Sequence, residues 1–234
     1  MRRNIIVIQI ILFLSLLSCD VISVEKYYDL AFDLEEKGKY LEAIAYHNKA
    51  LTKNPEFIPS LLNRGADKSM INDFNGAIDD YKKILEIDPQ LTFALVNLGN
   101  NYDKLKKYEK AIKSYTKAIE TRDVLKGVKD KEGNIIYLEL KFNSESSTTI
   151  YDYEIYYSRG LSYFNNENFQ LAISDFKKSL ETEYKKGEVY YWIGKSYIGI
   201  KDINSACENF IASSKLGVKD SKELLEKYCK KDTE

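Results

Sequence analysis

Residues that could carry acid–base, nucleophilic or metal chemistry are few in this sequence of 234 residues. It has one histidine, His47, and three cysteines, Cys19, Cys207 and Cys229. A lone histidine needs partners to act as a general base or a metal ligand, and no Ser/His/Asp set is evident around it. The sequence has no CxxC, HExxH or phosphate-loop motif, and "DKEGN" lacks the further oxygen ligands of a calcium loop. We therefore expect no enzymatic activity, no bound metal and no cofactor.

The charge balance argues against a nucleic-acid binder. The chain carries 35 basic and 36 acidic side chains, and its apolar content of 44% is that of a globular protein. Nucleic-acid-binding domains usually show a basic excess or a basic stripe. Many balanced charges with only three prolines favour helices whose surfaces carry interleaved ion pairs.

The N-terminus has the order of an export signal. Arg2 and Arg3 precede a 13-residue apolar run, residues 5–17, and a small residue, Ser18, stands before Cys19. As a helix, the run spans about 20 Å, whereas a bilayer core needs about 30 Å. A signal peptide over residues 1–18 is therefore a better interpretation than a permanent transmembrane helix.

Residues 16–19, Leu-Leu-Ser-Cys, resemble the lipobox of bacterial lipoproteins. The resemblance implies that Cys19 opens the mature chain, with a diacylglycerol on its thiol and a fatty acid such as palmitate on its amine. Two or more acyl chains anchor a protein stably, at about 0.8 kcal/mol for each buried CH₂. The alternative is a secreted protein with a chance cysteine at the cleavage site. The lipobox predicts a lipoprotein of the bacterial cell envelope that faces the periplasm, with residues 19–23 as a tether.

Five segments of the remaining chain align without gaps, as expected of a repeat protein. They share an alanine, with an apolar residue three positions before it and a ring-bearing residue four positions after it. The alanines are Ala43, Ala77, Ala111, Ala172 and Ala206. A small residue lies twelve positions before each of them: Ala31, Gly65, Gly99, Gly160 and Gly194. Apolar spacings of three and four predict pairs of amphipathic helices. We expect the small residues to let the two helices of a pair touch closely, Gly or Ala against Ala.

This pattern resembles the tetratricopeptide repeat, with units at residues 24–57, 58–91, 92–125, 153–186 and 187–220. The resemblance implies an all-α, right-handed solenoid of five helix pairs, whose concave groove is lined by the first helix of each pair. A solenoid needs a capped end. We expect residues 221–234 to form a cap helix and tail, with Leu224, Leu225 and Tyr228 covering the last unit.

Residues 126–152 interrupt the repeat between the third and fourth units. Residues 135–142, "IIYLELKF", alternate between apolar and polar side chains after a turn-like "DKEGN", which predicts a short hairpin or an extended flap. Two roles are open for this insertion. It folds back onto the neighbouring helices, or it walls off the groove or offers a strand edge to a partner.

The family geometry implies which side chains line the groove. At Tyr28 and Phe32 the sequence lacks the polar clamp with which some members bind a terminal carboxylate. An aromatic and aliphatic groove suits an apolar peptide or a partner helix, with Phe93, Tyr191 and Trp192 as the expected anchors. The alternative is that these rings pack against adjacent repeats. The full expected set is Tyr28, Phe32, Leu62, Asn63, Phe93, Val96, Asn97, Asn100, Tyr157, Leu161, Phe164, Tyr191, Trp192 and Lys195.

The ring position of the first unit holds His47, where the other four units have Tyr or Phe. We therefore expect His47 to be a core residue without partners for a ligand or catalytic role.

The two remaining cysteines are predicted to form a disulfide. Cys207 takes a position that holds isoleucine in the other four units, and Cys229 lies on the apolar stripe of the cap helix. Both are eleven residues from Val218, so they lie at the same height in an antiparallel helix pair. An exported protein meets an environment that allows the bond. Two unpaired buried thiols are the alternative.

Two functions are compatible with these features. The first is a membrane-anchored, non-enzymatic scaffold of the bacterial envelope that binds a peptide or partner helix in its groove. The alternative is a fixed structural or assembly subunit of an envelope machine. The lipid anchor brings the protein to a membrane, and no nucleic acid is expected as a partner.

Overall fold

The computed structural model describes residues 22–121, 128–129, 135–136, 152–180 and 185–229. Within these residues the chain forms eleven helices and two short strands. The elements are α2 (Val24–Glu35), α3 (Tyr40–Lys53), α4 (Ile58–Met70), α5 (Phe74–Ile87), α6 (Thr92–Lys104), α7 (Tyr108–Glu120), β1 (Val128–Lys129), β2 (Ile135–Ile136), α8 (Asp152–Asn165), α9 (Phe169–Ser179), α10 (Lys186–Gly199), α11 (Ile203–Lys215) and α12 (Asp220–Tyr228). Among the described residues, no helix is long and apolar enough to cross a membrane. The predicted signal peptide and Cys19 lie outside these residues.

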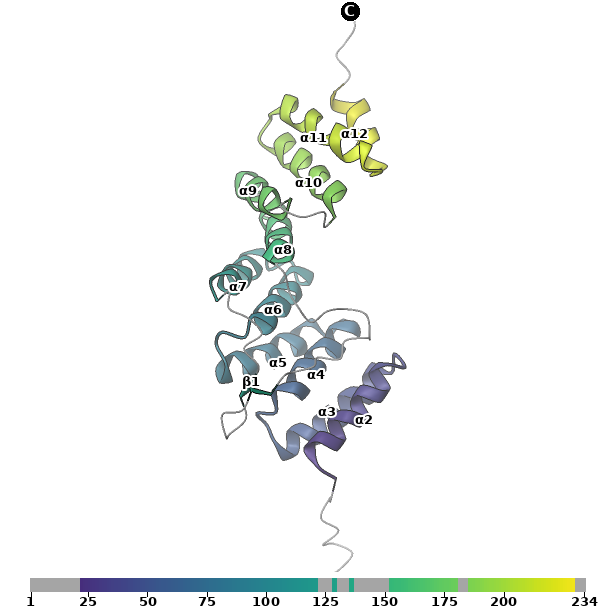
Figure 1. Cartoon of the computed structure of the whole chain (residues 1–234), viewed down its shortest axis with the longest axis vertical. Coiled ribbons are helices and arrows are strands. Elements are labelled where there is room, and N and C mark those ends of the chain that lie inside the picture. The colour runs from purple at the N-terminus through teal and green to yellow at the C-terminus, as the bar shows by residue number, and fades with distance from the viewer. Residues whose placement is uncertain (1–21, 122–127, 130–134, 137–151, 181–184, 230–234) are drawn as a thin grey trace, which may run out of the picture.

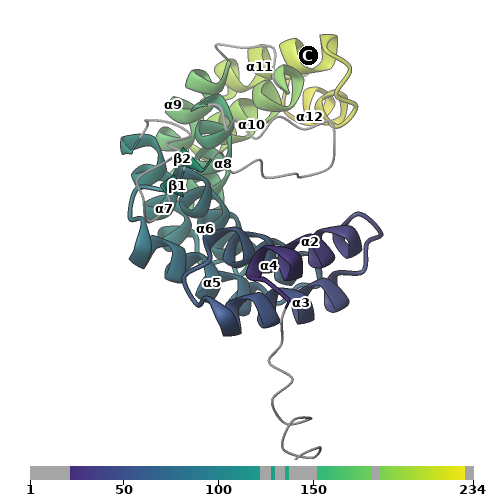
Figure 2. The same ribbon diagram turned by 60° about the horizontal axis from the view of Figure 1, so that its bottom comes forward.

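The helices stack into a curved solenoid, which confirms the predicted fold class (Figures 1 and 2). Each helix packs on the next one in the chain, from α2 to α12. The first helices of successive units also contact one another: α2 with α4, α4 with α6, α6 with α8, and α8 with α10. Such contacts are expected where the inner helices of a curved stack converge. Figure 2 shows this row on the inside of the arc, with the second helices outside.

The turn between the two helices of each unit has the same backbone geometry. One residue in each turn has a positive φ, and the next N–H returns to the carbonyl five residues earlier, as in a Schellman motif. Lys107 N, for example, donates to the Tyr102 oxygen at 2.8 Å. Only the first of the five turns uses glycine, so the other four hold an L side chain in the left-handed region. The positive-φ residues are Gly38 (69°), Asn72 (64°), Lys106 (56°), Glu167 (60°) and Lys201 (64°).

In the last four units the repeat glycine faces an aromatic ring of the second helix, where the sequence predicted a contact with alanine. A Cβ added to Gly99 would lie 2.6 Å from Cε1 of Tyr115, closer than carbon atoms pack. The glycines are therefore required for room, at a cost in helix propensity. The same holds for Gly65 with Tyr81, Gly160 with Phe176 and Gly194 with Phe210. The first unit differs at both positions, with Ala31 and the smaller imidazole of His47.

The insertion does not interrupt the stack. Helix α8 packs on α7 although 31 residues separate Glu120 from Asp152 along the chain. Arg159 Nη1 donates to Thr116 Oγ1 at 2.9 Å across this junction. The interface between the third and fourth units is therefore kept despite the insertion.

A short hairpin is present within the insertion, as predicted. β1 and β2 pair antiparallel, with Val128 opposite Ile136 and Lys129 opposite Ile135. The predicted strand extends to residue 142, but residues 137–142 and the turn at 130–134 lie outside the described residues.

Two units carry a buried arginine–aspartate pair between their helices. Arg64 donates from Nε to Asp80 Oδ2 at 2.9 Å, and Lys68 Nζ lies 2.7 Å from the same oxygen. Arg159 makes the same fork with Asp175, at 2.6 and 2.9 Å. The aspartates are almost fully buried, so these pairs are expected to fix the angle between the helices.

The last helix closes the solenoid as expected. Leu224, Leu225 and Tyr228 of α12 are half-buried, and the chain turns from α11 into this cap at Gly217, whose φ is 90°. Cys207 and Cys229 are joined in the structure, with their Cα atoms 5.7 Å apart. The predicted pairing is therefore the one that the structure contains.

Candidate functional site

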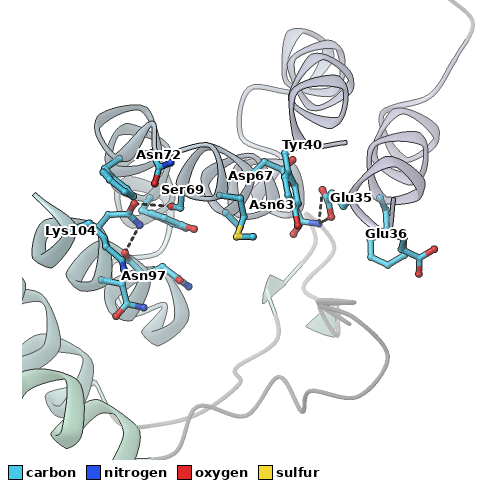
Figure 3. Close-up of a pocket in the computed structure, with 16 residues that line it drawn as sticks. Glu35, Glu36, Tyr40, Asn63, Asp67, Ser69, Asn72, Asn97 and Lys104 are labelled. Atoms are coloured by element: carbon cyan, nitrogen blue, oxygen red, sulfur yellow. Dashed lines mark hydrogen bonds between the residues drawn. The ribbon is translucent and has the colours of Figure 1, made fainter. Parts of the chain in front are cut away.

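A hollow of about 710 Å³ opens on the concave side of the first three units (Figure 3). We call it the groove hollow. Helices α2, α4 and α6 supply most of its lining, and residues of α3, α5 and the turns after α2 and α4 supply the rest. Its lining combines aromatic rings and five asparagines with three carboxylates, from Glu35 of α2, Glu36 just after it and Asp67 of α4. The lining residues are Phe32, Glu35, Glu36, Tyr40, Asn63, Ala66, Asp67, Ser69, Met70, Asn72, Phe74, Tyr81, Asn97, Asn100, Asn101 and Lys104.

Four of the predicted groove residues line this hollow: Phe32, Asn63, Asn97 and Asn100. Asn100 is exposed, and Phe32 and Asn97 are half-buried, so all three can contact a bound segment. The side chain of Asn63 is only 3% exposed and donates to both oxygens of Glu35, at 3.0 and 3.3 Å. It therefore shapes the floor of the hollow and is not a free contact group.

Two predicted groove residues belong to the core. Leu62 is 1% exposed and packs in the cluster that joins the first three units, so its assignment to the groove surface is wrong. Tyr157 is 7% exposed, and its hydroxyl donates to Glu188 at 3.1 Å. Both residues lie on the first helix of a unit, as predicted for groove residues. They are buried because they lie on the stripe of that helix that packs against neighbouring helices.

Tyr28, Phe93 and Val96 are half-buried and take part in packing. The Tyr28 ring stands edge-on to Phe57, with centroids 5.9 Å apart. Burial raises the pKa of the Tyr28 hydroxyl to about 12, with a smaller contribution from the Glu35 carboxylate. Phe93 and Val96 pack against the core of the first three units.

In the last two units, three of the predicted groove rings form one cluster around Lys195. Lys195 Nζ lies 4.5 Å from the ring centroid of Trp192, 5.2 Å from Phe164 and 5.4 Å from Tyr191. Phe164 and Tyr191 both stand edge-on to Trp192. A lysine held by cation–π contacts stabilises this aromatic cluster, so Trp192 and Tyr191 are weaker anchors than the sequence suggested. Leu161 also packs against the core of these units.

The sequence missed a buried polar cluster beside the groove hollow. His47 is fully buried, as expected, but it has partners. Its Nε2 lies 2.7 Å from Glu35 Oε1 and 3.8 Å from Asp67 Oδ2. Its Nδ1 lies 3.2 Å from Ser60 Oγ. The expectation of a histidine without partners is therefore wrong, because residues from the two neighbouring helices, α2 and α4, converge on it.

Asp67 is the least well satisfied member of this cluster. It is 3% exposed, and its Oδ2 has no hydrogen-bond partner among the described residues. Burial, and to a smaller extent the Glu35 carboxylate, raise the pKa of Asp67 to about 8. A buried carboxylate without a partner is costly, so this oxygen needs a proton or a cation beside it.

Each junction between units has three equivalent positions in the repeat, so the junctions of this chain can be compared with one another. We name the junctions by number from the N-terminus. The first holds Glu35, His47 and Asp67; the second Ser69, Tyr81 and Asn101; the third Asp103, Tyr115 and Ser162; the fourth Phe164, Phe176 and Ser196.

Only the first junction combines an imidazole with two carboxylates. In the second, the Ser69 hydroxyl donates to Asn101 Oδ1 at 2.8 Å. In the third, Asp103 accepts from the hydroxyls of Tyr115, at 3.0 Å, and Ser162, at 2.8 Å. These two junctions are satisfied by hydrogen bonds, whereas in the first the Asp67 Oδ2 atom has no hydrogen-bond partner among the described residues.

Comparisons with known proteins agree with the repeat. Residues 93–122 and 153–185 each match a tetratricopeptide repeat family model. The sequence matches none of the curated proteins with which it was compared.

Solved structures share the fold at low sequence identity. A MamA protein is 22% identical, with 88% of this chain and 94% of that chain covered and a TM-score of 0.66. MamA of Desulfovibrio magneticus RS-1 is 16% identical, over 82% and 94% of the two chains, with a TM-score of 0.66. YrrB, described as a TPR protein with an unusual peptide-binding site, is 17% identical over 84% and 87%, with a TM-score of 0.65. The chain therefore contains tetratricopeptide repeats and is similar in fold to these solenoid proteins.

Proposed function

We propose that this protein is a membrane-anchored scaffold of the bacterial cell envelope that binds an extended peptide or a helix of a partner in its concave groove. The groove hollow is the observation that carries the proposal. It combines exposed amides with aromatic walls on the concave face of a tetratricopeptide solenoid, and proteins of this fold generally act as interaction modules.

The composition of the hollow favours a backbone-binding mode. Asparagine side chains can donate to and accept from the peptide groups of an extended segment. Asn97 and Asn100 stand on α6 and face the hollow, and Phe32 on α2 offers an apolar contact across it. Apolar rings near the centre of an interface usually carry most of the binding energy.

The N-terminal sequence supports the location. The lipobox at residues 16–19 predicts acylation of Cys19, and the tether to Val24, the first residue of α2, is short. At up to about 3.5 Å for each residue, it holds the first unit close to the bilayer. The Cys207–Cys229 bond is also in keeping with an exported protein, because disulfides persist in oxidising compartments.

Membrane fractionation of a Cys19→Ser variant tests the anchor. We expect the variant to leave the membrane fraction or to keep its signal peptide. A variant that still sediments with membranes at the mass of the wild-type protein would refute the lipoprotein assignment. Mass spectrometry of unreduced peptides from the same preparation checks the disulfide, and two alkylatable thiols at Cys207 and Cys229 would contradict an oxidised exported form.

A pull-down from detergent-solubilised membranes, followed by titration with the purified partner, tests the groove. Replacing Phe32 or Asn100 by Ala should weaken binding by about 1 kcal/mol or more at a hot spot. Lys117→Ala on the outer helix α7 is the control and should not change the affinity. Equal affinity for all three variants, with unchanged thermal stability, would place the binding surface elsewhere.

A further inference from the structure

The first junction brings three potential metal ligands together. Glu35 on α2, His47 on α3 and Asp67 on α4 each offer one ligand atom, and these atoms all lie within 4.8 Å of one another. No other such group of three occurs among the described residues. Because the ligands come from three helices of two repeat units, the site exists only when the first two units are packed.

An unpartnered side chain points into this group. The Oδ2 atom of Asp67 is buried, lies 3.8 Å from His47 Nε2 and has no hydrogen-bond partner in the described part of the chain. The amide oxygen of the neighbouring Asn63 is also buried and unpartnered there. An orphaned carboxylate oxygen beside an imidazole indicates that a cation belongs next to it, because native buried acceptors are nearly always satisfied.

The surrounding contacts are those that hold metal ligands in place. His47 Nδ1 lies 3.2 Å from Ser60 Oγ, so the second ring nitrogen has a hydrogen-bond partner while Nε2 faces the carboxylates. Asn63 Nδ2 donates to both Glu35 oxygens and fixes the plane of that carboxylate. Ligating histidines and carboxylates usually have such outer partners, which set their orientation. Ser60, Asn63 and Asp67 lie on one buried stripe of α4.

We propose that the first junction binds one divalent transition-metal ion of the Zn²⁺ class, with His47 Nε2 and the carboxylates of Glu35 and Asp67 as ligands. Three ligand atoms around tetrahedral zinc lie roughly 3.3–3.5 Å apart. The present separations of 2.7 and 3.8 Å from Nε2 lie on either side of that value. All three ligand atoms lie within 4.8 Å of one another, so side-chain shifts of about 1 Å close the site.

Charge and ligand type select the ion. In the metal-bound state both carboxylates are ionised, and with a neutral imidazole they carry a charge of −2, which a divalent cation neutralises. An imidazole nitrogen suits Zn²⁺ and related ions, whereas Mg²⁺ and Ca²⁺ prefer sites made of oxygen alone. Binding requires the Nε2 lone pair, so the neutral ring carries its one N–H on Nδ1, where it can donate to Ser60. Glu35 and Asp67 also line the groove hollow, so the fourth coordination position faces the space open to a bound segment.

The test is a Zn²⁺ titration of the purified, chelator-treated mature protein by calorimetry, with the bound metal measured after dialysis. The wild-type protein should bind about one ion per chain, with a rise in its unfolding temperature. Asp67→Asn keeps the shape of the side chain and removes a ligand charge, and it should weaken binding at least about ten-fold. Asn101→Asp, at the same position of the second junction, is the matched control and should add no site. Every variant retains Cys19, so any binding by that residue cancels in the comparison.

A second variant guards against misfolding of Asp67→Asn. The combination Ala31→Gly, Glu35→Ser, His47→Tyr and Asp67→Asn gives the first junction the residues of the second, and it should fold and bind no Zn²⁺. Folded wild-type protein that takes up no Zn²⁺, or no more than this variant, overturns the proposal. Displacement of the bound Zn²⁺ by excess Ca²⁺ also overturns it, because the ion would then sit in an oxygen site. None of these results depends on whether the groove binds a partner.

Discussion

Replacing Gly99 by alanine tests the packing rule of the repeat. The new Cβ would lie 2.6, 2.8 and 2.9 Å from three ring atoms of Tyr115, whereas unstrained carbon contacts need about 3.5–4.0 Å. The ring is 1% exposed, and its hydroxyl donates to Asn100 at 2.7 Å and to Asp103 at 3.0 Å. It therefore cannot move by the required distance of about 1 Å without straining these bonds.

The expected cost follows from three contributions. Overpacking a core costs about 1–3 kcal/mol, and a hydrogen bond to a carboxylate, if lost, costs about 1.5–3 kcal/mol. The higher helix propensity of alanine offsets up to about 1 kcal/mol of this loss in stability. We expect Gly99→Ala to lower the free energy of unfolding by about 2–3 kcal/mol, measured by urea denaturation with circular dichroism and the fluorescence of Trp192.

The first unit supplies the compensating change. It pairs Ala31 with His47, so Gly99→Ala combined with Tyr115→His reproduces a combination that the chain already contains. The double variant should lose less stability than the sum of the two single variants, by about 0.5–3 kcal/mol of coupling. A Gly99→Ala variant that is more stable than the wild-type protein, or two changes that simply add, would refute the contact between glycine and ring.

Three further results are expected. Lys106→Gly should raise the free energy of unfolding by about 0.5–1 kcal/mol, because Lys106 has a φ of 56°. Lys107→Gly should lower it, because Lys107 has a φ of −90°. Equal effects of the two substitutions in urea denaturation would contradict the turn geometry. Asp80→Asn should lower the free energy of unfolding by about 3–5 kcal/mol because it leaves buried cations unpaired, and the exposed Asp79→Asn should have little effect in thermal unfolding. Burial raises the pKa of Asp103, so its contribution to stability is largest at low pH and declines as pH rises above about 4. Asp103→Asn should therefore flatten the dependence of the free energy of unfolding on pH in this range. An unchanged slope would argue against the buried carboxyl.

The helix pairs of the repeat could be predicted from the sequence. Alanines at fixed spacing and apolar residues three and four positions apart specify helix pairs, and the observed helices begin and end near the predicted unit boundaries. The Cys207–Cys229 pairing also followed from helix geometry, because equal distances from one turn place two residues at the same height. These features depend on local periodicity, which a single sequence displays directly.

The candidate site could be predicted only in part from the sequence, because its residues depend on which stripe of each helix packs against the neighbouring helices. Leu62 and Asn100 both lie on first helices, yet Leu62 is buried in the core and Asn100 is exposed in the groove hollow. The polar cluster of Glu35, His47 and Asp67 spans three helices without a motif. A signal was nevertheless present, since aligning these positions with those of the later units shows three ionisable side chains at the first junction alone.

Site-directed photo-crosslinking in cells tests the central claim most directly. A photoreactive amino acid at position 100 stands in the groove hollow, and one at position 117 stands exposed on the outer helix α7. If the concave groove holds a partner, position 100 should crosslink to one defined segment of an envelope protein in the membrane fraction, and position 117 should not. Equal crosslinking of that segment from position 117, or none from position 100 while the partner still co-purifies, would contradict the groove as the binding surface.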